Sequence, residues 1–159
     1  DLRDGRIVAI EANRECYELL CRNLAYNRAW NVSASHNALW SAPGTLDLQT
    51  GYAQANSLVA EVTKGDRTQV VETVTVDGVA ARLGLPRVTM LSLTLNGAEV
   101  EALDGASETL TQRRPRIRLA GWYKRGGVPI WQLTKAKLES HGYDVFVGPR
   151  GNVLALPKA

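Results

Sequence analysis

The chain alternates between uninterrupted apolar stretches and stretches in which apolar residues recur every three or four positions. The first apolar stretch, Ile7 to Ile10, lies in a strand predicted over residues 6–11 and is typical of a parallel strand covered on both faces. Four residues after it fall at helical spacing: Tyr17, Leu20, Cys21 and Leu24. Asn13 precedes this helix and is predicted to cap it. A strand followed by a helix indicates an α/β fold.

The rest of the chain repeats this alternation. Further strands are predicted over residues 32–38, 45–49, 69–76, 88–95, 117–120, 144–147 and 153–156. Further helices are predicted over residues 77–83, 98–111 and 130–141, with Asp77 capping the first and Gly142 ending the last. Residues 50–56 are predicted to be a loop, and a turn at residues 149–152 makes the last two strands an antiparallel hairpin. We therefore predict a single α/β domain over residues 1–159.

Composition agrees with one globular domain. The chain has 159 residues, of which 45% are hydrophobic and 22% charged. Since no apolar run approaches the roughly 18 residues of a membrane span, we expect no membrane partner. The first residues, Asp1 to Gly5, contain neither an initiator Met nor a signal core, so we interpret them as a processed or truncated terminus and expect a cytoplasmic protein.

The net charge of +3 hides an uneven distribution. Ten of the 19 Lys and Arg residues, but only two of the 16 Asp and Glu residues, lie from Arg113 onward. Cationic residues interleaved with aromatic ones, here Trp122, Tyr123, Trp131 and Tyr143, can bind nucleic acid. Because the segment has no recognisable nucleic-acid motif, we prefer a solvated basic surface, or an electrostatic match to a second copy, and keep nucleic-acid binding as an alternative.

The two cysteines are predicted to be free thiols. Cys16 and Cys21 lie about 140° apart around the axis of the first helix, too far apart in direction for a disulfide. Cys21 is on the apolar face and is expected in the core, whereas Cys16 is in the first turn, where the pKa of a thiol can be lowered. No cluster of suitable side chains has the spacing of metal ligands, so no metal site is predicted.

Glu11 closes the first predicted strand, directly before Ala12 and Asn13. In doubly wound folds, a carboxylate at the carboxyl end of a strand accepts hydrogen bonds from the ribose of a nucleoside cofactor. The other interpretation is an exposed carboxylate that stabilises the N-terminus of the next helix. The glycine-rich turn that holds the rest of such a cofactor lies roughly 20 residues upstream in the usual fingerprint, so we expect half of a cofactor site in this chain.

Six segments, in order along the chain, resemble one known family. They are Val8 to Asn13 with Leu19 to Asn27, Asn31-Val32 with Asn37 to Leu39, Asn56 to Val59, Val74 to Asp77, Gly97 to Glu99 with Leu103 to Ala106, and Gly142 to Phe146. Together they are similar to FkbM-type methyltransferases, which use S-adenosylmethionine. The resemblance extends over nearly the whole chain.

The resemblance implies a Rossmann-like class I methyltransferase sheet, mostly parallel with an antiparallel C-terminal hairpin. It also implies O-methylation of a hydroxyl on a small molecule or sugar, a reaction that needs in-line approach and a proton acceptor. The cofactor would lie against Glu11, Ala12, Asn13, Asn37 and Ala38. In this scheme Glu11 holds the ribose hydroxyls, and Asn37 with Ala38 borders the adenine.

The chain departs from the family in two places. The family's glycine-rich turn falls before residue 1, so we expect a sheet without its first strand. Thr94 and Asn96 stand where the family has two carboxylates ahead of Glu99, which leaves these three residues as candidates for the catalytic positions. Thr94 and Asn96 can hydrogen-bond a substrate but cannot act as carboxylate bases. For Glu99 we prefer the interpretation that it complements and caps its helix N-terminus over a catalytic role.

The loop after the strand at residues 117–120 is the candidate substrate loop, because substrates bind at the carboxyl ends of strands in open α/β sheets. Its candidate residues are Trp122, Tyr123, Lys124 and Arg125. A plain surface loop is the other interpretation.

Two further hypotheses follow from the missing strand. A methyltransferase could obtain that strand from another segment or another chain, or the chain could be a catalytically degenerate binding or assembly module. Strand edges without a partner favour pairing with another molecule, so a homodimer or strand-swapped dimer is predicted.

Overall fold

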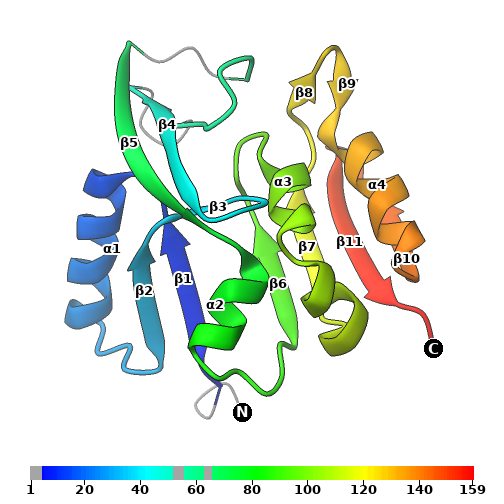
Figure 1. The fold of residues 1–159 in the computed structure, drawn as a ribbon, viewed down its shortest axis with the longest axis horizontal. Helices are drawn as coiled ribbons and strands as arrows, with labels where there is room; N and C mark the ends of the chain where they lie inside the picture. The colour runs from blue at the N-terminus through cyan, green and yellow to red at the C-terminus, as the bar shows by residue number, and fades with distance from the viewer. Residues whose placement is uncertain (1–4, 52–55, 63–65) are drawn as a thin grey trace.

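The computed structural model describes residues 5–51, 56–62 and 66–159 and has an α/β architecture (Figure 1). It begins with β1 (Ile7–Glu11), α1 (Arg14–Tyr26) and β2 (Val32–His36). β1 and β2 pair in parallel, with Glu11 opposite His36. The Asn13 side chain accepts a hydrogen bond from the Cys16 N–H at 2.9 Å, so the predicted cap is confirmed.

The largest sheet has the order β10-β11-β7-β6. Its strands are β6 (Met90–Leu93), β7 (Arg116–Ala120), β10 (Tyr143–Val147) and β11 (Asn152–Pro157). β6 and β7 are parallel, whereas β11 runs antiparallel to both of its neighbours, which confirms the predicted hairpin. Among the described strands, β1 pairs only with β2 and β6 only with β7, so no hydrogen-bonded ladder joins the two parallel pairs.

Two smaller sheets complete the strands. The first has the order β3-β5-β4, formed by β3 (Ala38–Leu39), β4 (Gly44–Thr50) and β5 (Arg67–Val74), and the second pairs β8 (Lys124–Arg125) with β9 (Val128–Pro129). The single strand predicted over residues 32–38 is therefore divided between β2 and β3, which belong to different sheets. Part of the loop predicted over residues 50–56 lies outside the described residues.

The helix predicted over residues 98–111 is wrong in its length. α3 (Glu99–Asp104) ends before Gly105, and a π-helical turn, η3, covers Thr109–Arg113. The backbone at Gly105 passes so close to Trp40 that a Cβ there would lie 2.3 Å from the Trp40 carbonyl oxygen. The Asp77 N–H also donates to the Gly105 carbonyl at 3.0 Å. These two contacts fix Gly105, the residue that follows α3, against distant parts of the chain.

The predicted role of Asp77 is also wrong. α2 (Val76–Arg82) is capped by Thr75, whose side-chain oxygen accepts from the Gly78 N–H at 2.9 Å. Asp77 instead accepts from the N–H groups of Glu108 and Thr109, at 2.8 and 2.7 Å, and so holds the segment that leads into η3. The sequence correctly indicated that a helix is capped here, but Thr75 provides the cap. The Asp77 carboxylate is therefore available to bind a segment that is distant in sequence.

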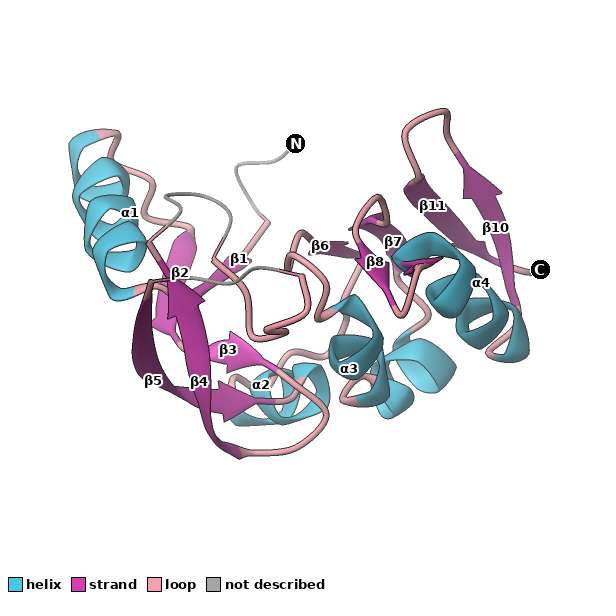
Figure 2. Ribbon diagram, turned by 90° about the horizontal axis from the view of Figure 1, so that it is seen from above, coloured by secondary structure: helices cyan, strands magenta, loops and turns pink. Residues whose placement is uncertain are grey.

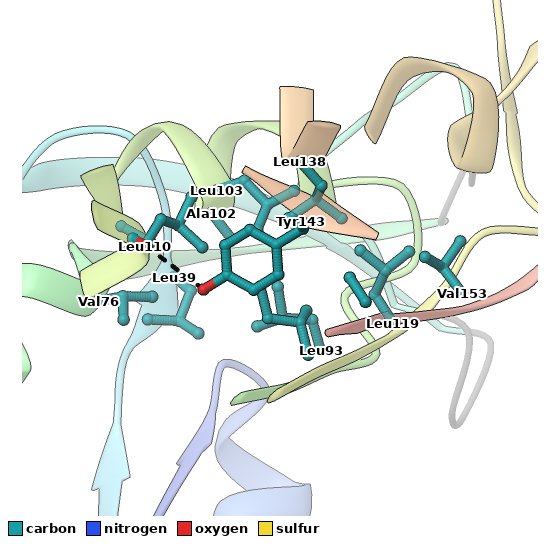
Figure 3. Close-up of a cluster of buried hydrophobic side chains, with 13 residues drawn as sticks. Leu39, Val76, Leu93, Ala102, Leu103, Leu110, Leu119, Leu138, Tyr143 and Val153 are labelled. Atoms are coloured by element: carbon teal, nitrogen blue, oxygen red, sulfur yellow. Dashed lines mark hydrogen bonds between the residues drawn. The ribbon is translucent and has the colours of Figure 1, made fainter. Parts of the chain in front are cut away.

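The hydrophobic core lies between the largest sheet and the helices α3 and α4 (Ile130–Ser140), which cover one of its faces (Figure 2). Tyr143 stands among Leu93, Leu103 and Leu138, and its hydroxyl donates to the Leu110 carbonyl at 3.4 Å (Figure 3). Each fully buried leucine contributes about 1.5–3 kcal/mol to stability. The core therefore anchors β6, whose carboxyl end leads into the candidate site.

α1 packs less deeply than this core. None of its residues is fully buried, and the predicted apolar face, including Cys21, is half-buried. The expectation that Cys21 belongs to the core is therefore wrong, although both cysteines are free as predicted. α1 therefore keeps much of its surface exposed to solvent.

Candidate functional site

A cavity of about 280 Å³ lies where β1, β3 and β6 end. The carboxyl ends of parallel strands in α/β proteins are where ligands bind. The cavity is lined by Ile10, Glu11, Ala12, Cys16, Asn37, Ala38, Leu39, Leu48, Asn56, Leu58, Thr94, Leu95, Asn96 and Ala98. The fold thus brings into one cavity six residues that the sequence had singled out in three separate segments: Glu11, Ala12, Asn37, Ala38, Thr94 and Asn96.

The β1 side of the cavity is built by local hydrogen bonds. One carboxylate oxygen of Glu11 accepts from the Asn13 N–H at 2.8 Å, which ties the end of β1 to the start of α1. Asn13 is buried and caps α1, but it does not line the cavity. Glu11 therefore combines both of its predicted features, a link to the helix N-terminus and a position at the cavity.

Cys16 also lines the cavity, a position that the sequence did not single out as a binding position. Burial raises the pKa of its thiol, and the carboxylates of Glu11 and Glu15 raise it further. The position in the first turn of α1 does not lower the pKa as the sequence suggested. Cys16 is consequently a protonated thiol at neutral pH and offers a packing surface and a weak hydrogen bond.

The turn between β2 and β3 forms the next part of the lining. Asn37 is buried, and its side-chain oxygen accepts from the Ser35 hydroxyl at 2.6 Å. His36 stacks on Tyr17 with ring centroids 5.2 Å apart, and its Nε2 lies 3.1 Å from the Ala12 carbonyl oxygen. These contacts fix the turn against α1 and bring Asn37 and Ala38 to the same cavity as Glu11.

The turn after β6 forms the opposite part of the lining, and Glu99 supports it. Glu99 is fully buried, and its two carboxylate oxygens accept from the N–H groups of Leu95 and Gly97 at 2.8 and 2.9 Å. Burial raises the pKa of this carboxyl, although the hydrogen bonds from the backbone act against that rise. Glu99 does not line the cavity, whereas Thr94 and Asn96 do.

Residues 56–58 supply lining that the sequence did not assign to a site. Asn56 and Leu58 face the cavity, and Ser57, which is buried, donates from its hydroxyl to the Asn96 carbonyl at 2.7 Å. The only sequence signal for this segment was its similarity to a family loop, which carried no residue role.

The predicted substrate loop leads into a short hairpin that lies outside the lining of the cavity. Trp122, Tyr123, Lys124 and Arg125 do not line it. The hairpin of β8 and β9 is fastened to α3 by an ion pair between Arg125 and Glu101 at 2.6 Å. Trp122 remains 46% exposed, and its ring lies 6.0 Å from that of Tyr123.

The described residues contain neither a candidate metal centre nor a candidate membrane-spanning helix. No group of three or more His, Cys, Asp or Glu side chains among these residues is placed to hold a metal ion. Within the same ranges, no helix has both the length and the apolar character needed to span a membrane.

Comparison with known proteins gives two similarities. A family model described as the methyltransferase FkbM domain matches residues 2–145. The fold is similar to the crystal structure of a methyltransferase FkbM from Methylobacillus flagellatus KT, with a TM-score of 0.61 and 14% identity. That match covers 96% of this chain and 36% of the solved chain, so this chain spans about a third of its structural relative. No curated protein matches the sequence.

Proposed function

The chain belongs to the FkbM methyltransferase family, and from this premise we propose that it binds S-adenosylmethionine and methylates a hydroxyl of a small molecule or sugar. The observation that carries the proposal is the shared cavity. Glu11 and Asn37 from one half of the fold line the same space as Thr94 and Asn96 from the other. A donor site and an acceptor site must adjoin in this way for a methyl group to be transferred directly.

The lining fits the nucleoside part of the cofactor. Glu11 has one carboxylate oxygen engaged by the Asn13 N–H, and as a carboxylate it can accept hydrogen bonds from ribose hydroxyls with the other. Asn37 and Ala38 would border the adenine, with Ala12 and Asn13 shaping the backbone beside it. The volume of about 280 Å³ is just below the roughly 300–1,000 Å³ that small-molecule sites occupy. When bound, the cofactor supplies a methyl group carried on a sulfonium.

The acceptor side offers orientation more than proton transfer. Thr94 and Asn96 are neutral groups that can hydrogen-bond an acceptor hydroxyl. Glu99 does not reach the cavity, because both of its oxygens are held by backbone N–H groups. Trp122, Tyr123, Lys124 and Arg125 would extend the acceptor site from the adjacent hairpin. These residues position a hydroxyl, and the proton passes to solvent or to a group of the acceptor itself.

We propose in addition that the sheet is of the Rossmann-like class I type. Supporting this, residues at or just after the carboxyl ends of β1 and β6 line the cavity, and each strand has one strand partner among the described residues. A parallel strand from elsewhere in a longer protein, or from a second copy in a homodimer or strand-swapped dimer, would pair with both edges. Light scattering tests the second source: a mass of one chain at all concentrations contradicts a dimer.

Calorimetric titration with S-adenosylhomocysteine tests the function. We expect wild-type protein to bind, and Glu11→Gln to bind about 10- to 100-fold more weakly, because a charged acceptor of ribose hydrogen bonds is lost. Glu15→Gln is the matched control, since Glu15 is exposed in the first turn of α1 and does not line the cavity. Absence of heat from the wild type at millimolar ligand would refute cofactor binding by this chain. Binding without transfer to any hydroxyl compound would indicate a binding module.

A further inference from the structure

Residues 56–62, which we call the clasp, lie across the 94–98 turn and are fastened to it by hydrogen bonds. The Ser57 hydroxyl donates to the Asn96 carbonyl at 2.7 Å and accepts from the Val59 N–H at 3.0 Å. The Asn96 side chain in return donates to the Asn56 carbonyl at 2.8 Å. Ser57 is 1% exposed, so its hydroxyl is costly to leave without a hydrogen-bond partner.

Close packing strengthens the same junction. Gly97 has φ +104°, and a Cβ at this position would lie 2.6 Å from Cγ2 of Val62. The missing side chain therefore lets Val62 of the clasp rest directly on the turn. From the other side, the Glu99 carboxylate holds the N–H groups of Leu95 and Gly97. The turn is thus held by hydrogen bonds with both the clasp and Glu99.

The clasp is also attached at both of its ends. At the first end, the backbones of Gln49 and Ser57 exchange two hydrogen bonds, at 2.8 and 3.1 Å. At the second, the Gly126 N–H donates to the carboxylate of Glu61. The clasp therefore connects β4, the turn after β6 and the β8–β9 hairpin, three parts of the molecule that are distant in sequence.

We propose that Ser57 and Glu99 are positioning residues, and that through the clasp and the turn they set the cavity wall formed by Asn56, Leu58 and Asn96. The three wall residues line the cavity, and the two positioning residues do not. A wall held by hydrogen bonds within the protein loses less conformational entropy when it binds a ligand. The inference deepens the proposed function, and it rests on that proposal only for the identity of the ligand.

Hydrogen exchange of Ser57→Ala tests the clasp without reference to activity. We expect exchange about five- to 50-fold faster at Val59, Leu95 and Gly97, because the Asn96 carbonyl and the Val59 N–H lose their buried partner. Strands β7 and β11 should keep their protection. Ser140→Ala is the control. The exposed Ser140 hydroxyl donates to the Lys137 carbonyl of the same helix and lies near the ring of the adjacent His141. Faster exchange at Val59 alone, or uniformly across β7 and β11, would overturn the proposal.

A second variant covers the case in which Ser57→Ala does not fold. Val62→Ala keeps every hydrogen bond of the junction but removes the packing on Gly97. We expect the same pattern of faster exchange at Leu95 and Gly97, with a smaller amplitude of about two- to ten-fold. If exchange at Leu95 and Gly97 stays unchanged, packing of Val62 does not stabilise the turn, and the proposal is contradicted.

Titration with S-adenosylhomocysteine then separates this inference from the proposed function. We expect Ser57→Ala to bind the ligand about three- to ten-fold more weakly than wild type, because the wall loses a hydrogen bond that holds it. Equal affinity in a variant whose turn exchanges faster would overturn the role of the clasp in shaping the cavity. If the wild type does not bind the ligand at all, the proposed function fails, and hydrogen exchange alone decides whether the clasp is as described.

Discussion

The two sides of the cavity are held together by contacts of very different range. On the β1 side, hydrogen bonds connect Glu11 with Asn13 and Asn13 with Cys16, residues two and three positions apart. On the β6 side, the hydrogen bonds of Asn96 with Ser57 and Asn56 span 39 and 40 positions. The hydrogen bonds of Glu11 and Asn13 thus stay within one βα unit, whereas those of Asn96 depend on a segment that is distant in sequence.

This difference determines how each side responds to substitution. A local cap stabilises its own helix, so its loss affects one element by a modest amount. A buried junction between distant segments leaves unpaired polar groups when one member is removed, and the cost is larger. We therefore expect variants on the β6 side to affect stability more than variants on the β1 side.

Glu99→Ala is expected to have the largest effect, because Glu99 is fully buried, although its hydrogen-bond partners are only two and four positions away. It leaves the N–H groups of Leu95 and Gly97 without the carboxylate that both donate to, so we expect a loss of about 2–4 kcal/mol in the free energy of unfolding, measured by urea denaturation. The control is Glu139→Ala, which removes an exposed carboxylate and should change stability by less than about 0.5 kcal/mol. A loss below about 1 kcal/mol for Glu99→Ala would show that the turn does not depend on this carboxylate.

Asn13→Ala tests the local side. Because the side chain of Asn13 caps α1 through the Cys16 N–H, we expect a loss of about 1 kcal/mol in the same measurement. Asn13→Ser, which keeps a capping oxygen, should retain most of the stability. Equal losses in the two variants would mean that burial of the asparagine, and not the cap, is what matters.

The pH dependence of stability gives a smaller effect. Burial raises the pKa of Glu99 in the folded state, so between the unfolded and folded pKa values the folded protein binds more protons than the unfolded one. Stability from this group is therefore greatest below its unfolded pKa and falls as the pH rises through the raised folded pKa. Relative to Glu99→Gln, which does not titrate, the wild type should lose stability over this range in urea titrations at a series of pH values. A relative gain with rising pH would contradict the direction.

The smallest effect concerns Cys16 on the β1 side. Since burial and the nearby carboxylates raise the pKa of its thiol, we expect alkylation by iodoacetamide at neutral pH to be slower than that of a free cysteine. Glu11→Gln removes one of those charges and should speed the reaction several-fold, as followed by peptide mass spectrometry. Rapid labelling of the wild type at neutral pH would argue against this environment.

Much of the fold was predictable because its signals are local. Asn13 as a cap, Gly142 at the end of α4 and the hairpin of β10 with β11 all depend on residues within a few positions of one another. The break after α3 was not predictable, since it depends on the approach of Gly105 to Trp40, 65 positions earlier. The predicted capping role of Asp77 was wrong for the same reason, because its partners, Glu108 and Thr109, are 31 and 32 positions away.

In the candidate site, too, some residues could be identified from the sequence and others only from the folded structure. Glu11 was singled out by its place at the end of an apolar strand, and Asn37 and Thr94 by the family resemblance; all three line the cavity. The roles of Cys16, Ser57 and Glu99 did not follow, since each depends on burial or on a partner that the pattern does not identify. Trp122 and its neighbours follow a strand end as predicted, but none of them lines the cavity, and Lys124 and Arg125 form strand β8 of a hairpin.

By itself, the sequence determined the first βα unit with its Asn13 cap, the closing hairpin and the family, because these depend on the order and spacing of neighbouring residues. The tertiary structure decided which of the candidate residues share a cavity, and that Glu99 supports the turn from outside it. It also decided that residues 56–62 complete the wall. The physical reason is that burial and long-range hydrogen bonds arise only when distant segments pack together, so their strength and partners belong to the folded chain.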